Sequence, residues 1–264
     1  MVTVNTVAVK EIVSKSKIPG VDYVLNPYVG CTHGCVYCYA AYMRKFSGHT
    51  QPWGHFLDVK IGPRPLKPSR LFGKNVMLSS VTDPYNPFEK RYQNTRTLLR
   101  QLIPCQARVS ILTKSALVLR DLDLLTQLPG CEVGFSFSGV DEALRQKLEP
   151  NTSTVQEKIN ALKILHEHAL CTAVMAAPLL PGISQWQEII ERTRAYTDAY
   201  RFDALNMATP LQEDMFRFIR VHYPQFLPLY REIYVQGNRA YWKDLSEKIR
   251  TYCKKNQVRA EVFF

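Results

Sequence analysis

Short apolar runs alternate with longer segments of helical periodicity over most of the chain. The segments that predict strands are residues 75–80, 108–113, 131–138, 171–176 and 202–207. The segments that predict helices are residues 92–102, 117–128, 141–148, 154–169 and 186–200. In residues 154–169, for example, Val155, Ile159, Leu162 and Leu165 recur at close to helical spacing. A strand–helix unit is therefore repeated at least five times along the chain.

The segment before these units has a different pattern. Residues 2–7 alternate between apolar and polar side chains, and residues 21–25 form a second apolar run before a turn at residues 26–30. We expect strands that enter a loop there. Residues 62–74 are rich in proline and basic side chains, which favours an exposed connection over a regular element.

Repeated strand–helix units predict an α/β fold with a parallel sheet and right-handed crossovers. In such sheets and barrels the chemistry collects at the carboxyl ends of the strands. Residues 215–264 are helical and aromatic, and we expect them to pack against the sheet. The length of 264 residues suits one domain, with a core from about residue 20 to 210 and a helical extension over about residues 211–264.

Composition narrows the class of protein. Apolar residues make up 46% and charged residues 22%, so a packed core is expected. No apolar run reaches the roughly eighteen residues of a membrane-spanning helix, and residues 1–10 lack the pattern of a signal peptide. We therefore expect a cytoplasmic protein whose seven cysteines are reduced thiols rather than a disulfide framework.

The formal charge of +11 would attract nucleic acid, anionic cofactors or acidic protein partners. The basic residues are spread along the chain instead of forming one block. A solvated basic surface without a specific partner is therefore the alternative interpretation.

Three cysteines, Cys31, Cys35 and Cys38, lie within eight residues and can converge on one metal centre. Thiolates favour iron–sulfur clusters or zinc. A structural zinc site needs a fourth ligand, and no second pair of closely spaced cysteines or histidines follows downstream. Zinc held with the help of His33 or His49 remains an alternative, as do inert core cysteines.

The spacing Cys-x3-Cys-x2-Cys, with the aromatic Tyr37 just before the last cysteine, resembles the signature of the radical S-adenosylmethionine (SAM) superfamily. The resemblance implies a [4Fe-4S] cluster on three cysteines, with the fourth iron open to the amino and carboxylate groups of SAM. An electron from the cluster would cleave SAM to methionine and a 5′-deoxyadenosyl radical, which abstracts hydrogen from the substrate. It also implies an electron donor such as flavodoxin or ferredoxin.

A closer resemblance, to the branch that includes spore photoproduct lyase, covers most of the chain. It rests on residues 26–40, 80–85, 113–114, 136–138, 148–150 and 177–182, which fall at or just after predicted strand ends. The resemblance implies a partial (β/α)6 barrel of the radical SAM type, with the cysteine loop after the first strand and the helical extension covering one side.

The resemblance also implies roles for residues near the first strand ends. Ser80, Thr82 and Asp83 would lie beside the amino group of SAM. Lys114 would reach the SAM carboxylate or ribose. The alternatives are that Asp83 only forms a turn before Pro84 and that Lys114 is a solvated surface lysine.

Further strand ends complete the predicted cofactor site. Ser136 and Ser138, which share a face of their strand, would bond the ribose or the methionine carboxylate. The backbone of Ala177 and Pro178 would contact adenine, and Glu149 would have a structural role.

One departure limits the resemblance. The lyase returns a hydrogen atom from a cysteine close before its Ser/Asp segment, whereas residues 77–83 of this chain contain no cysteine. Photoproduct repair by that route is therefore not expected. Three hypotheses follow: a radical SAM enzyme acting on a peptide, protein or small metabolite; one acting on nucleic acid; and a non-catalytic zinc-binding nucleic-acid module.

The other cysteines, Cys105, Cys131, Cys171 and Cys253, show no cluster spacing. We expect buried structural thiols, with Cys131 and Cys171 brought together at the starts of neighbouring strands.

Overall fold

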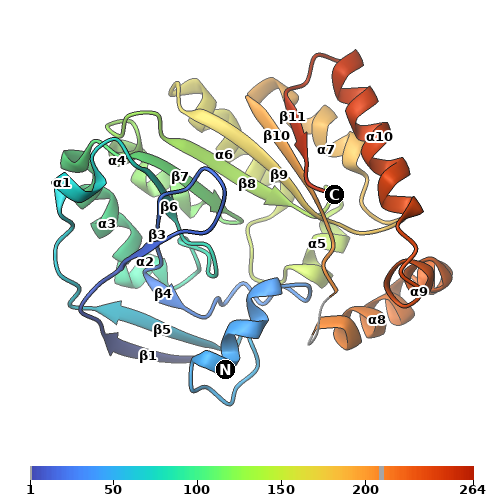
Figure 1. The fold of residues 1–264 in the computed structure, drawn as a ribbon, viewed down its shortest axis with the longest axis horizontal. Helices are drawn as coiled ribbons and strands as arrows, with labels where there is room; N and C mark the ends of the chain where they lie inside the picture. Colours follow the sequence, from blue (N-terminus) through green and yellow to red (C-terminus); the bar gives the residue numbers. More distant parts are fainter. Residues whose placement is uncertain (1, 208–210) are drawn as a thin grey trace.

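A computed structural model describes residues 2–207 and 211–264 (Figure 1). Its main feature is an eight-stranded sheet in the order β11-β10-β9-β8-β7-β6-β3-β2, in which only the β2–β3 pair is antiparallel. The sheet's strands are β2 (Val13–Lys15), β3 (Tyr23–Leu25), β6 (Asn75–Leu78), β7 (Arg108–Thr113), β8 (Glu132–Phe137), β9 (Cys171–Leu179), β10 (Ala199–Ala204) and β11 (Ala260–Val262).

Helices lie between the successive parallel strands, and the last three of the described α-helices lie between β10 and β11 (Figure 1). The α-helices are α1 (Pro68–Leu71), α2 (Glu89–Tyr92), α3 (Asn94–Leu102), α4 (Leu122–Leu125), α5 (Glu142–Leu148), α6 (Val155–Glu167), α7 (Trp186–Thr193), α8 (Leu211–His222), α9 (Leu227–Tyr234) and α10 (Ala240–Lys255). Short 3-10 helices are η1 (Tyr39–Phe46), η2 (Ile103–Cys105), η3 (Ala116–Asp121), η4 (Arg194–Tyr196) and η5 (Pro224–Phe226). None of the described helices combines the length and hydrophobicity that a bilayer-spanning helix needs.

Local sequence explains where the central helices begin. The Thr154 side chain accepts from the backbone N–H of Glu157, whose side chain accepts in return from the Thr154 N–H, so α6 begins with a capping box. The Asp141 carboxylate caps α5 without a capping box, accepting from the backbone N–H groups of Ala143 and Leu144.

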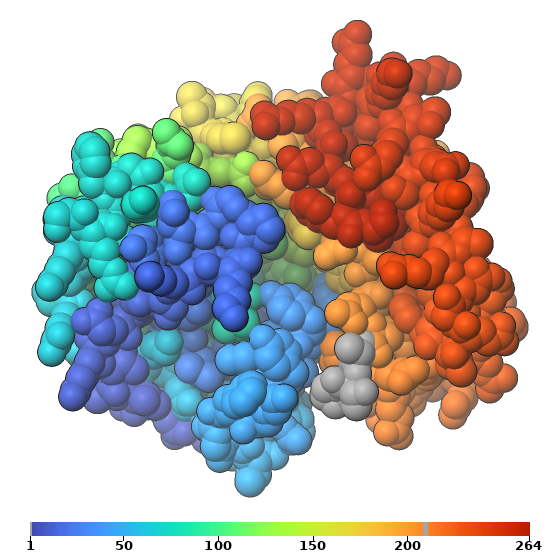
Figure 2. Space-filling model, viewed as in Figure 1, coloured from blue at the N-terminus to red at the C-terminus, as the bar shows by residue number. Residues whose placement is uncertain are grey.

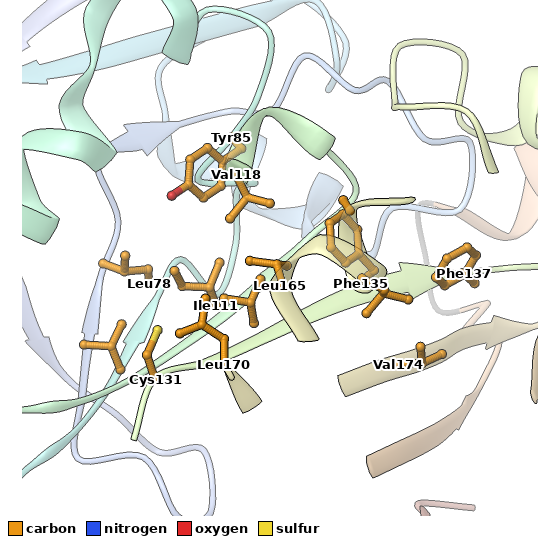
Figure 3. Packing of buried hydrophobic residues seen from close by; sticks show 14 of the residues in the cluster. Leu78, Tyr85, Ile111, Val118, Cys131, Phe135, Phe137, Leu165, Leu170 and Val174 are labelled. Carbon is orange, nitrogen blue, oxygen red and sulfur yellow. The ribbon is translucent and has the colours of Figure 1, made fainter. Parts of the chain in front are cut away.

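The main core lies against the sheet and is covered by helices that include α3, α6 and α7 (Figure 3). Val133 of β8 pairs with Ile111 of β7, and Phe135 and Phe137 of the same strand are fully buried. Leu165 of α6 packs into the same cluster. Burial on both faces is typical of a parallel sheet, and it explains why these strands have continuous apolar runs.

Two predicted boundaries are wrong at the end of the barrel. The predicted helix over residues 186–200 ends at Tyr196, and β10 begins at Ala199 rather than at residue 202. The Thr193 hydroxyl bonds the Ile189 carbonyl and also the Tyr200 hydroxyl. A backbone that turns here lets Tyr200 enter the sheet, where it is buried.

Three other differences concern short elements. The predicted helix over residues 117–128 starts as η3, a 3-10 helix, and becomes α-helical only at Leu122. The connection over residues 62–74 contains α1, which Pro68 begins at a position where proline is favoured. The predicted helical tail ends in β11, which pairs with β10 through Val262 and Phe202.

A second, three-stranded sheet supports the start of the cysteine loop. It has the order β1-β5-β4, where the strands are β1 (Thr3–Ala8), β5 (Phe56–Ile61) and β4 (Tyr28–Val29). β5 was not predicted from the sequence, although residues 57–61 alternate between apolar and polar side chains as a strand does. β4 leads directly into Gly30, whose φ of 85° lies in the left-handed region.

We predict that Gly30→Ala destabilises the protein more than Gly20→Ala. Both glycines have left-handed backbones, which cost an alanine roughly 1–2 kcal/mol. A Cβ on Gly30 would also lie 2.5 Å from the Phe56 carbonyl oxygen, whereas one on Gly20 would meet no described atom within 4 Å. Overpacking adds about 1–3 kcal/mol. Equal losses in urea unfolding would contradict the contact with β5.

Candidate active site

The three cysteines of the loop face one cavity at the carboxyl ends of β6, β7 and β8. The cavity measures about 130 Å³. It brings together most of the residues that the sequence analysis selected: Cys31, Cys35, Cys38, Ser80, Thr82, Asp83, Lys114 and Ser136. Tyr37, Ser138 and Ala177 are not on its wall, although each contacts a group connected to it.

The segment after α5 fixes the backbone of the cysteine loop. The Val36 N–H donates to the Leu148 carbonyl at 2.9 Å, and the Asn151 N–H donates to the His33 carbonyl at 3.3 Å. The Asn151 side chain donates to the Thr32 carbonyl at 3.0 Å. The loop therefore has a defined shape that depends on residues more than a hundred positions away.

The cysteine side chains are half-buried and free. Burial raises the pKa of Cys38 to about 11, with a further contribution from nearby Cys31, and burial also raises the pKa of Cys35 well above its ordinary value. Metal centres are bound by thiolates, so binding one here would release protons from these cysteines.

Asp83 follows β6 and organises the floor of the cavity. Its carboxylate accepts from the Thr113 hydroxyl at 2.7 Å, from the Lys114 N–H at 2.9 Å and from the Tyr85 N–H at 2.8 Å. The His33 Nδ1 lies 3.3 Å away. The contact with Tyr85 is that of a turn-forming aspartate, and the bonds from Thr113 and Lys114 join the end of β7 to it.

Electrostatics agree with this role. Burial by itself raises the pKa of Asp83, but His33 and the donated hydrogen bonds outweigh it and lower that pKa below the ordinary range. Burial likewise lowers the pKa of His33, while the Asp83 carboxylate and Cys31 raise it to about 10. The two side chains form a buried ion pair beside the cysteines.

Ser80 and Thr82 connect the cysteine loop to the end of β6. The Thr82 hydroxyl donates to the Gly30 carbonyl at 2.5 Å, and the Ser80 N–H donates to the Asn26 side chain at 3.0 Å. The Tyr39 hydroxyl donates to the Ser80 carbonyl. These contacts hold η1 and the loop against the strand.

Lys114 ends β7 and points into the cavity. Its Nζ donates to the Ser136 hydroxyl at 2.9 Å, and that hydroxyl donates to the Ala177 carbonyl at 3.0 Å. Burial lowers the pKa of Lys114, but the negative groups around it raise that pKa above its ordinary value. Lys114 is thus a charged cavity lysine, and the alternative of a solvated surface lysine is wrong.

Glu149 lies fully buried behind the loop and connects Tyr37 to the sheet. It accepts from the Tyr37 hydroxyl and, at 3.0 Å, from the Ser138 hydroxyl. The Nζ of Lys158, which is also buried, lies 3.5 Å from Glu149 and donates to the Ser136 carbonyl at 3.1 Å. The structural role expected for Glu149 is confirmed, and Ser138 belongs to this network rather than to the cavity wall.

Several residues of the site were not predicted from the sequence. Ser79 is buried at the end of β6 with a φ of 67°, and its hydroxyl has no partner among the described residues. The Thr32 hydroxyl, in the cysteine loop, also has no partner among the described residues. Backbone strain and unpaired buried donors are typical of sites that hold a ligand, but neither has a sequence pattern.

The kinds of donor group at the site, rather than their present spacing, suit the predicted metal and cofactor. Three free thiols suit an iron–sulfur centre, and a lysine with several polar groups suits an amino-acid carboxylate. His49, named as a possible zinc ligand, instead pairs with Asp58 at 2.9 Å and stacks on Phe56. Among residues 2–207 and 211–264, no group of three or more His, Cys, Asp or Glu side chains has an arrangement suited to a metal ion.

The model of the radical SAM superfamily matches residues 25–193. The chain belongs to this superfamily. An uncharacterized protein of Methanocaldococcus jannaschii is 33% identical to it, covering 94% of this chain and 92% of that protein. A radical SAM Nα-GlyT isomerase of Pseudomonas phage M6 is 26% identical over 62% of this chain and 34% of the isomerase.

Solved structures of radical SAM enzymes have the same fold. Spore photoproduct lyase complexed with dinucleoside spore photoproduct aligns with a TM-score of 0.59 at 15% identity, over 84% of this chain and 66% of the lyase. Streptococcus suis SuiB bound to S-adenosylmethionine aligns with a TM-score of 0.60 at 14% identity, over 91% of this chain and 50% of SuiB. The predicted partial barrel with a helical extension is thus confirmed.

The cysteines outside the loop of this radical SAM protein lie away from the cavity. Cys105, Cys131 and Cys253 are buried as predicted, and Figure 3 shows Cys131 in the main core. Cys171 is exposed, so the prediction of a buried thiol is wrong there. It begins β9 opposite Glu132, beside Cys131, as expected from the strand order.

We predict that Glu149→Ala lowers the free energy of unfolding by about 3–5 kcal/mol, because it leaves Lys158 charged and buried without its partner. Glu167→Ala, which breaks the exposed pair with Lys163, should change it by less than about 1 kcal/mol. Thermal or urea unfolding measures both. Equal small effects would contradict a structural role for Glu149.

The same carboxylate predicts a dependence on pH. Burial raises the pKa of Glu149, but Lys158, Lys114 and the donated hydroxyls outweigh it and hold that pKa below 4.5. Its contribution to stability is therefore complete above pH 4.5 and is lost as the pH falls through the lowered value. The difference between wild type and Glu149→Ala should shrink in acid, and a constant difference from pH 7 to pH 2 would contradict the lowered pKa.

Proposed function

We propose that this chain is a radical SAM enzyme that holds a [4Fe-4S] cluster on Cys31, Cys35 and Cys38 and abstracts hydrogen from a substrate. When bound, the cluster and SAM together supply the 5′-deoxyadenosyl radical. The observation that carries the proposal is that the three thiols and Lys114 share one cavity at the carboxyl ends of the parallel strands.

The protein's own contribution is to bind, orient and exclude water. Lys114 is the cation that would bind the SAM carboxylate or ribose, and Ser136, held by Lys114 and Ala177, orients it. Ser80, Thr82 and the unpaired Ser79 hydroxyl supply polar groups for the amino end of SAM. Asp83 acts through Thr113 and the Lys114 backbone rather than as a free acceptor.

The reductant we propose is a small electron carrier such as flavodoxin or ferredoxin, in a reducing cytoplasm that keeps the thiols free. The substrate is a peptide, protein or metabolite, or alternatively a nucleic acid. Met77 lies on the cavity wall, and the cysteines of that wall are the three predicted ligands. This supports a hydrogen transfer different from the cysteine-mediated route implied by the resemblance to the lyase.

We predict that the anaerobically reconstituted wild type is brown and forms 5′-deoxyadenosine from SAM under dithionite, whereas Cys35→Ala forms almost none. Cys171→Ala, which removes an exposed thiol distant from the cavity, is the matched control and should behave like wild type. Iron content, visible absorbance and liquid chromatography of the products provide the readouts. A colourless wild type that binds zinc would overturn the proposal in favour of a metal-binding module.

We also predict that Lys114→Met weakens equilibrium binding of SAM by about ten- to a hundredfold, the effect of losing a charge-assisted hydrogen bond. Lys60→Met removes another partly buried lysine, from β5, that does not lie on the cavity. The control should bind SAM like wild type in calorimetry of the reconstituted protein. Equal affinity of Lys114→Met and wild type would remove Lys114 from the cofactor site.

A further inference from the structure

A groove of about 620 Å³ runs between the cysteine loop and α8. One wall is formed by residues 34–36, η1 and Trp53, and the other by one face of α8. Figure 2 shows the light-blue segment that contains η1 and the orange segment that contains α8 on the same face of the molecule. We call this hollow the basic groove.

The basic groove adjoins the cavity of the three cysteines. Cys35 lies on the wall of both. The helix η1 separates them, because Tyr39 and Ala40 line the cavity while Ala41 and Arg44 line the groove. A molecule lying in the groove would therefore pass within one 3-10 helix of the predicted cofactor site.

Positive charge predominates along the groove. Arg44 and Lys147 are exposed on its walls, and no ion pair involving either is found in the described part of the chain. Arg217 is paired with Glu213 and Asp214. A second hollow of about 320 Å³ shares Arg217 and adds the exposed Arg220 and Arg231 on the other side of α8: these cations continue the positive band past the end of the groove.

Exposed aromatic rings stand on η1 next to the groove, although they do not line its wall. Tyr39, Tyr42 and Phe46 of η1 are 58%, 42% and 69% exposed. The Lys45 ammonium lies 4.9 Å from the centre of the Phe46 ring. Large rings left in water at this density are unusual outside interaction sites. Their alternation with basic residues matches the combination that binds single strands, in which rings stack on bases and cations follow the phosphates.

We propose that the basic groove, continued over the exposed face of η1, binds a single-stranded nucleic acid beside the cavity. The inference rests on the proposed function for the chemistry, and it selects the substrate class. Arg44 and Lys147 would contact phosphates, and the rings of Tyr42 and Phe46 would stack on bases. An acidic peptide would satisfy the cations but would leave the exposed rings without a partner.

The test is fluorescence anisotropy of the reconstituted protein with labelled oligothymidylate of about twelve nucleotides, a length within the usual site sizes. Binding should weaken as salt rises from about 50 to 200 mM, with log K falling by about 0.7 per log salt for each phosphate contacted. Arg44→Ala/Lys147→Ala should weaken binding about tenfold and reduce that slope by about 1.4.

A second double variant separates stacking from charge. Tyr42→Ala/Phe46→Ala should weaken binding about thirtyfold or more with an unchanged salt slope, since each ring is worth about 1–3 kcal/mol. The matched control, Lys254→Ala/Lys255→Ala at the far end of α10, removes the same charge and should bind like wild type. Circular dichroism and iron content show whether each variant is folded and loaded.

Absence of salt-dependent binding, or equal losses in the groove variant and the α10 control, would overturn the inference. Equal competition by polyglutamate, together with full binding by Tyr42→Ala/Phe46→Ala, would overturn it in favour of an acidic peptide. Cleavage of SAM by the wild type is measured separately. Cleavage without oligonucleotide binding would sink only this inference, and binding without cleavage would sink only the proposed radical chemistry.

Discussion

The site depends on the hydrogen bonds and the ion pair of the buried Glu149 carboxylate. A charge with no exposed surface is stable only when several donors satisfy it, and here Lys158, Ser138 and Tyr37 do so. Tyr37 belongs to the cysteine loop, Ser138 follows β8, and Lys158 lies on α6. One buried group therefore connects the loop, the sheet and a helix, and the loop cannot move independently of the barrel.

The parallel part of the fold could be predicted from sequence because its strands are apolar on both faces and its helices carry their own caps. Thr154 with Glu157 and Asp141 are such local signals. β11 could not be predicted in this way. It is a short edge strand whose pairing partner, β10, is distant in sequence, so tertiary contacts rather than a local pattern place it. β5 is the central strand of the small sheet, and the alternation of its residues 57–61 is a local signal of its own.

The site too has a part that the sequence could predict and a part that depends on tertiary contacts. Three cysteines in one loop, and polar residues at successive strand ends, meet because parallel strands end at one edge. The sequence could not show which hydroxyls are already engaged. Ser136 and Ser138 share a face, yet one turns to Lys114 and the cavity and the other to Glu149. Nor could it reveal the left-handed backbone of Ser79, which depends on the route of the chain after β6.

The short helix η1 is a wall of two hollows at once, and its Tyr39 hydroxyl is bonded to the Ser80 carbonyl at the end of β6. A shared wall is a route for thermodynamic linkage. If occupancy of the groove displaces η1, it changes the affinity of the cavity for its cofactor, and the cofactor must change the affinity of the groove by the same factor. The radical would then form in the cavity preferentially when a substrate in the groove is present to react with it.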